Sequence, residues 1–133
     1  MARSDVTRDI VDTLGQVPEF FKDLPDDQLE REWSTFKQFQ LGDTALTARE
    51  KHLIGLAVAA AIHCPYCTYF HQGATAMMGT TEEQLEEAVR IASETSKWST
   101  YIHGRQIDLE RFKSQTDEIG AYLGKKAAER VAA

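Results

Sequence analysis

Two helix starts in the middle of the chain constrain the fold more than any other feature. Thr47 and Glu50 have the spacing of a capping box, in which each side chain bonds the backbone N–H of the other residue. Pro65, directly after Cys64, suits the first position of a second helix, where its missing N–H costs nothing. The intervening residues 51–62 are apolar nearly all round a helix, which is typical of the buried centre of a fold. Two consecutive helices around such a centre indicate an all-α protein.

The rest of the chain carries helical signals, and no segment has an alternating partner that would make it a convincing strand. Residues 98–102 could be extended, but nothing is available to pair with them. We therefore expect a single-domain bundle of about six helices over residues 1–133. The expected elements are a helix from Asp5 to Leu14, an aromatic turn over 19–24, and helices over 25–40, 48–62, 65–78 and from Thr81 onward, with a last helix from about Gly104 to Leu123, closed by Gly124.

The chain contains two cysteines, Cys64 and Cys67, and His71 follows one helical turn later. Residues three and four apart lie on one helix face, so Cys64 can form a disulfide with Cys67, and Cys67 can bond to His71. The positive end of the helix dipole and a neighbouring histidine both favour a thiolate. We expect Cys67 to be the more acidic thiol, because it has both influences.

Two other roles for the cysteine pair fit the sequence less well. A structural zinc site needs four ligands, and no second Cys or His pair occurs at the usual spacing. A disulfide that closes so short a loop would stabilise a domain of this size very little. The spacing therefore favours a redox-active pair, with no metal and no cofactor.

Composition and charge limit the partners of the chain. Its 133 residues are 42% apolar, which is enough for a real core, and the formal net charge is −6. Phosphate binding needs clustered Lys and Arg, so we expect no nucleic-acid partner. The first residues are polar and charged, and the longest apolar run, Leu53 to Ile62, is too short to cross a bilayer. We expect a cytoplasmic protein without a membrane partner.

Several runs together resemble the carboxymuconolactone decarboxylase-like superfamily, and within it the alkyl hydroperoxidase D type. They are the Leu46–Ala59 lead-in, the C-x-Y-C-x-x-x-H run over 64–71 and the helix capped by 79–83. The resemblance covers about residues 46–104. It implies an all-α oligomer, a dimer, trimer or hexamer, that reduces hydroperoxides. It also implies that Cys67 attacks the peroxide and that Cys64 resolves the product.

The sequence departs from this family at the proton relay. The family pattern places a glutamate twelve residues before the first cysteine, where this chain has His52. Glu50, the nearest carboxylate, lies about 200° further round the helix, and the capping box gives it another role. His52 can pass protons to and from His71, but it cannot supply a fixed negative charge. Tyr66 replaces a histidine that some relatives have between the cysteines, and it could donate a hydrogen bond or simply pack.

Two further histidines have structural explanations beside functional ones. His63 precedes Cys64 and could raise the local positive field, but a histidine at a helix C-terminus is favourable for dipole reasons alone. His103 lies near Trp98 and Tyr101 and could line a pocket or an oligomer contact, although buried rings are ordinary core behaviour.

These observations predict a thiol-dependent hydroperoxide reductase with Cys67, Cys64, His71 and His52 at its centre. An external dithiol, such as a lipoyl or thioredoxin-like protein, would restore the reduced pair. The alternative is a non-enzymatic redox sensor or disulfide-exchange module. Decarboxylation of a lactone fits less well, because that chemistry does not need two thiols.

Overall fold

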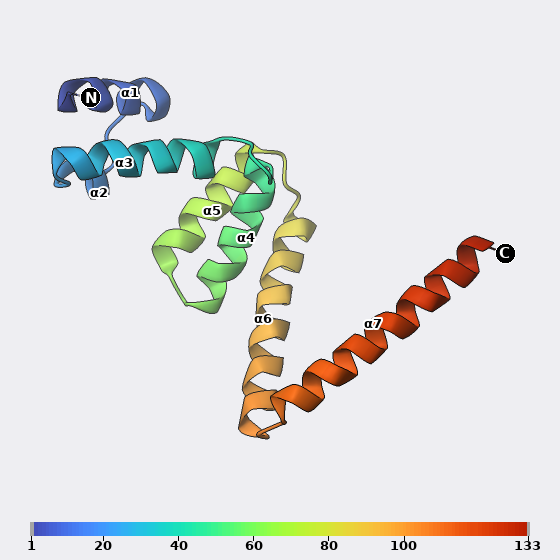
Figure 1. The fold of residues 1–133 in the computed structure, drawn as a ribbon. Helices are drawn as coiled ribbons and strands as arrows, with labels where there is room; N and C mark the ends of the chain where they lie inside the picture. Colours follow the sequence, from blue (N-terminus) through green and yellow to red (C-terminus); the bar gives the residue numbers. More distant parts are fainter. Residues whose placement is uncertain (1, 133) are drawn as a thin grey trace. The chain divides into compact units, whose positions relative to one another are not determined.

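The computed structural model describes residues 2–132, and all of its regular elements are helical (Figure 1). The all-α prediction is confirmed, but the described part holds seven α-helices and a π-helical turn rather than about six helices. The elements are α1 (Arg3–Leu14), α2 (Glu19–Lys22), α3 (Asp26–Phe36), the π-helical turn η1 (Lys37–Leu41), α4 (Ala48–Ala61), α5 (Pro65–Met77), α6 (Glu82–Gly104) and α7 (Leu109–Ala132).

The chain divides into two compact units, one ending at Ala92 and the other beginning at Ser93. The first unit holds the cysteines and the helices from α1 to the start of α6. The second holds the rest of α6 and α7. The expectation of one domain over the whole chain stays a prediction.

An apolar core joins α1, α2 and α3 within the first unit. Its polar edge is a hydrogen bond from the Trp33 indole N–H to the Asp9 carboxylate, 2.7 Å long, which Lys37 supports with an ion pair. The core residues are Val6, Ile10, Phe21, Leu29 and Trp33. Full burial of an apolar side chain stabilises a fold by about 1.5–3 kcal/mol relative to leaving that side chain exposed.

Helices α4 and α5 pack side by side, and they carry the cysteines and both central histidines (Figure 1). The buried face of α4 consists of Ala48, His52, Leu56 and Ala59. The apolar pattern of residues 51–62 predicts the buried centre of the fold, and one face of α4 is buried in the single chain. On the other side Ile54 and Val58 are exposed, as is Ile62 at the C-cap.

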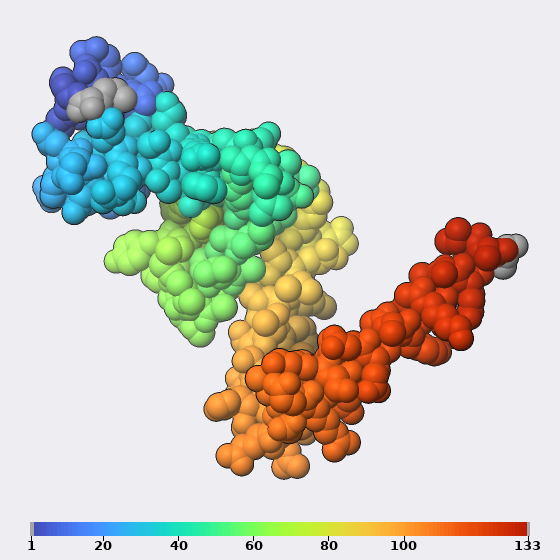
Figure 2. All heavy atoms as spheres, in the orientation of Figure 1, coloured from blue at the N-terminus to red at the C-terminus, as the bar shows by residue number. Residues whose placement is uncertain are grey.

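The C-terminal helices are longer than the sequence predicts. Helix α6 continues without a break through residues 98–102, the segment that could have been extended. Helix α7 runs past Gly124 instead of ending there, since a glycine inside a helix costs only about 1 kcal/mol relative to alanine. No described residue of α7 is buried, and Figure 2 shows one face of this helix, in orange to red. None of the described helices has the length and apolarity needed to cross a membrane.

Candidate functional site

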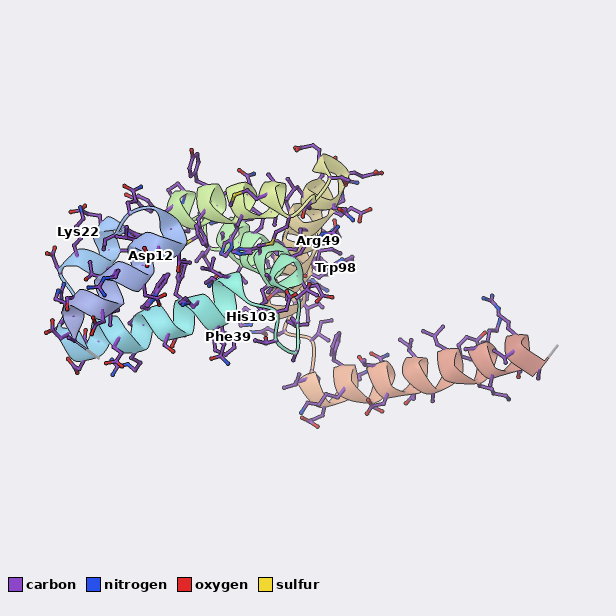
Figure 3. The ribbon with its side chains drawn as sticks, turned by 90° about the horizontal axis from the view of Figure 1, so that it is seen from above. Asp12, Lys22, Phe39, Arg49, Trp98 and His103 are labelled. Carbon is purple, nitrogen blue, oxygen red and sulfur yellow. The ribbon has the colours of Figure 1, made fainter. Side chains whose placement is uncertain are left out.

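The capping box at the start of α4 is present as predicted. The backbone N–H of Thr47 donates to the Glu50 carboxylate over 2.7 Å, and the N–H of Glu50 donates to the Thr47 hydroxyl over 3.2 Å. Hydrogen bonds from the backbone and side chain of Thr47 hold the pKa of Glu50 below its usual value. Next to it, Arg49, which is labelled in Figure 3, donates to the hydroxyl of Thr80 just before α6 and to the side-chain oxygen of Gln84 in its first turn. Glu50 therefore anchors the helix start, and it has no hydrogen bond to His71 within residues 2–132.

A tight turn connects the end of α4 to Cys64. The N–H of Cys64 donates to the carbonyl of Ala59 over 3.0 Å, and the N–H of His63 donates to that of Ala60 over 3.2 Å. This pair of bonds is a Schellman motif, which ends a helix with one residue in the left-handed conformation. That residue is His63, whose φ is 58°. The structural interpretation of His63 therefore has a specific basis in the turn.

Cys64 caps α5 with its sulfur. The backbone N–H of Cys67 donates to Sγ of Cys64 over 3.2 Å, and Pro65 occupies the first turn as predicted. Both cysteines are free thiols, and both are partly accessible.

The two thiols differ in acidity. Hydrogen bonds from the Cys67 thiol and then from its N–H lower the pKa of Cys64. The pKa of Cys67 is raised, first because its thiol donates to Cys64 and then because of burial. These directions are opposite to the expectation that Cys67 is the more acidic thiol, because the pKa of Cys64 is lowered and that of Cys67 is raised.

His52 and His71 meet between α4 and α5. Their Nδ1 atoms lie 2.9 Å apart, and Nε2 of His52 lies 2.7 Å from the carbonyl oxygen of Gln40. The side chain of His52 is 0% exposed. Burial, and then the neighbouring His52, lower the pKa of His71. The imidazole of His71 is therefore held uncharged near neutral pH, where it can accept a proton.

The ring of His71 lies directly over the backbone of Gly55. A Cβ atom built on Gly55 would come 2.3 Å from Cε1 and 2.4 Å from Nε2 of that ring, which no side chain could tolerate. Phe70 packs against both histidines, with ring centroids 5.5 Å from His52 and 5.1 Å from His71. The imidazole of His71 therefore lies against the backbone of α4 at Gly55 and also contacts the ring of Phe70.

The remaining predicted residues lie outside this cluster. Tyr66 is 85% exposed, so it does not pack under the start of α5. His103 belongs to the second unit, where it borders a cavity of about 450 Å³ with Ile102 and Leu109. Cys67 and His71 share no hydrogen bond among the described residues. No three His, Cys, Asp or Glu side chains within residues 2–132 gather so that they could hold a metal ion.

The chain is similar to known proteins in sequence and in fold. Residues 27–108 match the model of the carboxymuconolactone decarboxylase family. The chain belongs to this family. The crystal structure of the alkylhydroperoxidase AhpD core from Rhodospirillum rubrum is similar, with a TM-score of 0.69 and 29% sequence identity over 82% of this chain and 84% of that one. The resemblance inferred from the sequence is therefore confirmed.

A further relative comes from Paracoccus denitrificans, where it is described as uncharacterized protein 4 in the cox locus. It is 38% identical over 64 residues. The matched stretch covers 48% of this chain and 58% of that protein, so this chain matches less than two thirds of the relative.

Sequence reasoning missed two parts of the site, the carbonyl of Gln40 and the bare backbone of Gly55. A main-chain carbonyl leaves no trace in a sequence pattern. Gly55 did leave one, because a glycine inside an apolar helix costs stability and often marks a close approach by another group.

Proposed function

We propose that this protein is a thiol-dependent peroxidase that reduces hydroperoxides through Cys64 and Cys67. The observation that supports this most is the hydrogen bond from the Cys67 N–H to Sγ of Cys64, which places both sulfurs at the start of one helix and stabilises a thiolate there. Membership of the family and the likeness to an alkylhydroperoxidase core support the same chemistry. His71 and His52 then serve as the route for protons.

The first step transfers one oxygen from the peroxide to sulfur. Although the pKa of Cys64 is lowered, we propose Cys67 as the attacking residue, because the resemblance to the alkyl hydroperoxidase D type assigns the attack to the second cysteine of the pair. The proton of Cys67 moves to Cys64 or to His71, and the thiolate attacks the O–O bond. That bond breaks, the sulfur becomes a sulfenic acid, and the alkoxide leaves as an alcohol after taking one proton.

The next step closes the disulfide. The thiol of Cys64 displaces water from the sulfenic acid on Cys67, which forms the S–S bond. An external dithiol then attacks Sγ of Cys67 and expels Cys64, because the thiol of lower pKa is the better leaving group. A second attack within the reductant releases Cys67 and leaves the reductant oxidised to its own disulfide. We propose a cytoplasmic dithiol for this role, of the lipoyl or thioredoxin type.

We also propose that copies of this chain assemble through apolar surfaces that the single chain leaves open. Ile54 and Val58 on α4 and Ile62 at its C-cap are apolar and exposed. A soluble chain that exposes a continuous apolar surface of this kind usually covers it with a partner.

Sustained consumption of a hydroperoxide with a dithiol present tests the proposal. The wild-type protein should turn over many equivalents, whereas Cys67→Ser should abolish turnover. Without the dithiol, Cys64→Ser should reduce one equivalent and then stop with a trappable sulfenic acid on Cys67. Oxidation that stops after one equivalent in the wild type, despite excess dithiol, would favour the redox-sensor alternative and contradict the enzyme.

A further inference from the structure

We propose that the carbonyl of Gln40 sets the direction of proton transfer at this site, acting through His52, and that Gly55 makes room for the imidazole that receives the proton. In this arrangement Nδ1 of His71 carries a hydrogen and Nε2 of His71 is the free base. The inference rests on the proposed function for its role in catalysis, but the arrangement of hydrogens can be measured without any peroxide. Gln40, His52 and Gly55 are positioning residues.

The direction follows from the two hydrogen bonds of His52. A carbonyl oxygen only accepts, so Nε2 of His52, 2.7 Å from the carbonyl of Gln40, carries a hydrogen. Two nitrogens 2.9 Å apart share one hydrogen, so either His52 or His71 donates across the Nδ1 pair. If His52 is uncharged, its Nδ1 has no hydrogen. His71 must then donate from Nδ1, which leaves the lone pair on its Nε2.

If His52 donated to His71 across the Nδ1 pair instead, His52 would have to be charged. Its ring would carry hydrogens on both nitrogens while 0% exposed. Within residues 2–132 its ring interacts with the carbonyl of Gln40, the imidazole of His71 and the ring of Phe70, and none of these three groups is an anion. A buried cation without an anionic partner is strongly unfavourable. The uncharged His52 is therefore the favoured form, and the carbonyl fixes which tautomer it adopts.

The Gln40 carbonyl is available because of where it lies. It belongs to η1, at the end of the α3 segment, where the last carbonyls of a helix have no partner within the helix. The Lys51 ammonium donates a hydrogen bond to the carbonyl of Gly42 over 2.6 Å, and Nε2 of His52 donates one to the carbonyl of Gln40. An ionised glutamate at position 52 would only accept hydrogen bonds, so it could not donate one to the Gln40 carbonyl as His52 does.

Gly55 decides whether the imidazole of His71 can reach its position. With a Cβ on residue 55 only 2.3 Å from Cε1, the ring would have to move away from α4. Such a movement would break the 2.9 Å contact with His52. Gly73 on α5 offers a matched control, because a Cβ there would meet nothing within 4 Å.

Nitrogen-15 NMR of the reduced protein at about pH 8, where histidine side chains are ordinarily uncharged, reads each ring tautomer directly. We expect the hydrogen of His52 on Nε2 and that of His71 on Nδ1. His71 with its hydrogen on Nε2 would overturn the inference, whatever the peroxidase assay gives. Conversely, a protein inactive on peroxides with the expected tautomers would refute the proposed function alone.

Variants separate positioning from simple packing. Gly55→Ala should turn the single His71 tautomer into a mixture, while Gly73→Ala leaves it unchanged. His52→Leu should have the same effect as Gly55→Ala. His52→Gln should restore the Nδ1–H form of His71, because an amide offers one donor and one acceptor. A His71 spectrum that is the same in wild type, Gly55→Ala and His52→Leu would refute both positioning roles.

Discussion

The backbone N–H of Cys67 donates a hydrogen bond to Sγ of Cys64 over 3.2 Å. The bond makes a cysteine sulfur the cap of α5, a position that oxygen side chains such as Ser or Asp usually occupy. A sulfur in this position gains stability as a thiolate, because the N–H and the Cys67 thiol both donate to it. The lowered pKa of Cys64 therefore follows first from the hydrogen bond that the Cys67 thiol donates and then from the capping N–H, and not from a histidine.

Removal of the second thiol should make the first one less acidic. Cys67→Ala should raise the pKa of Cys64, because it removes the thiol donor that lowers this pKa most. Cys67→Ser keeps a hydroxyl donor at the same place, so it should leave the Cys64 pKa closer to the wild-type value. Thiolate absorbance or alkylation rate against pH measures both. Equal pKa values in the two variants would show that the side chain of residue 67 has no influence.

The turn at His63 should gain stability from glycine. His63 adopts a φ of 58°, which costs a residue with a Cβ about 1–2 kcal/mol. His63→Gly should therefore raise the free energy of unfolding by about 1 kcal/mol relative to His63→Ala, which keeps the Cβ. Urea denaturation of the two variants gives the difference. If His63→Ala were as stable as His63→Gly, the strained turn would not be present in solution.

Acid should destabilise the fold through His71. Its folded pKa is lowered from the ordinary 6.5 by burial and then by His52, so the unfolded chain binds the proton more tightly. The stabilisation is complete above about pH 6.5 and is lost as the pH falls through the lower folded pKa. His71→Gln removes this titration, so its stability should fall less steeply between about pH 7 and 5. Denaturant titrations across that range compare the two slopes, and equal slopes would contradict the lowered pKa.

The local signals of the sequence predicted much of this site. The Thr47–Glu50 capping box, the Cys64 cap and the Pro65 start depend on residues near one another in the chain, and all are present. The meeting of His52 with His71 depends instead on how α4 and α5 rotate against each other. Helical periodicity says which residues share a face but not which atoms face across the contact, so the roles of Gln40 and Gly55 emerged only from the fold.

The C-terminal part shows a different limit of sequence reasoning. The last helix begins at Leu109 and not at about Gly104, which instead ends α6. Gly124, predicted to close the last helix, lies inside α7 with no contact to distinguish it. A glycine can end a helix or lie inside it, and its cost inside a helix is only about 1 kcal/mol relative to alanine. The order of acidity of the two thiols was missed for a related reason, because it depends on a hydrogen bond between their sulfurs.

We expect the protein to assemble in solution. The exposed side chains of Ile54 and Val58 on α4 and of Ile62 at its C-cap would be covered by another copy. Light scattering at micromolar concentration should report a particle larger than the 15.0 kDa chain. Val58→Glu should weaken the assembly, whereas Glu86→Gln, on an exposed part of α6, should leave it intact. A particle of 15.0 kDa for the wild type would contradict assembly.

The central claim, that Cys64 and Cys67 form the reactive pair, is tested most directly by mass spectrometry of the peptide that contains both. After one equivalent of hydroperoxide, this peptide should lose two hydrogens, and a dithiol should restore them. The Cys64→Ser variant should instead carry one added oxygen, trapped on Cys67. If both thiols of the wild type can still be alkylated after treatment with hydroperoxide, the pair is not redox-active toward peroxides and the account is wrong.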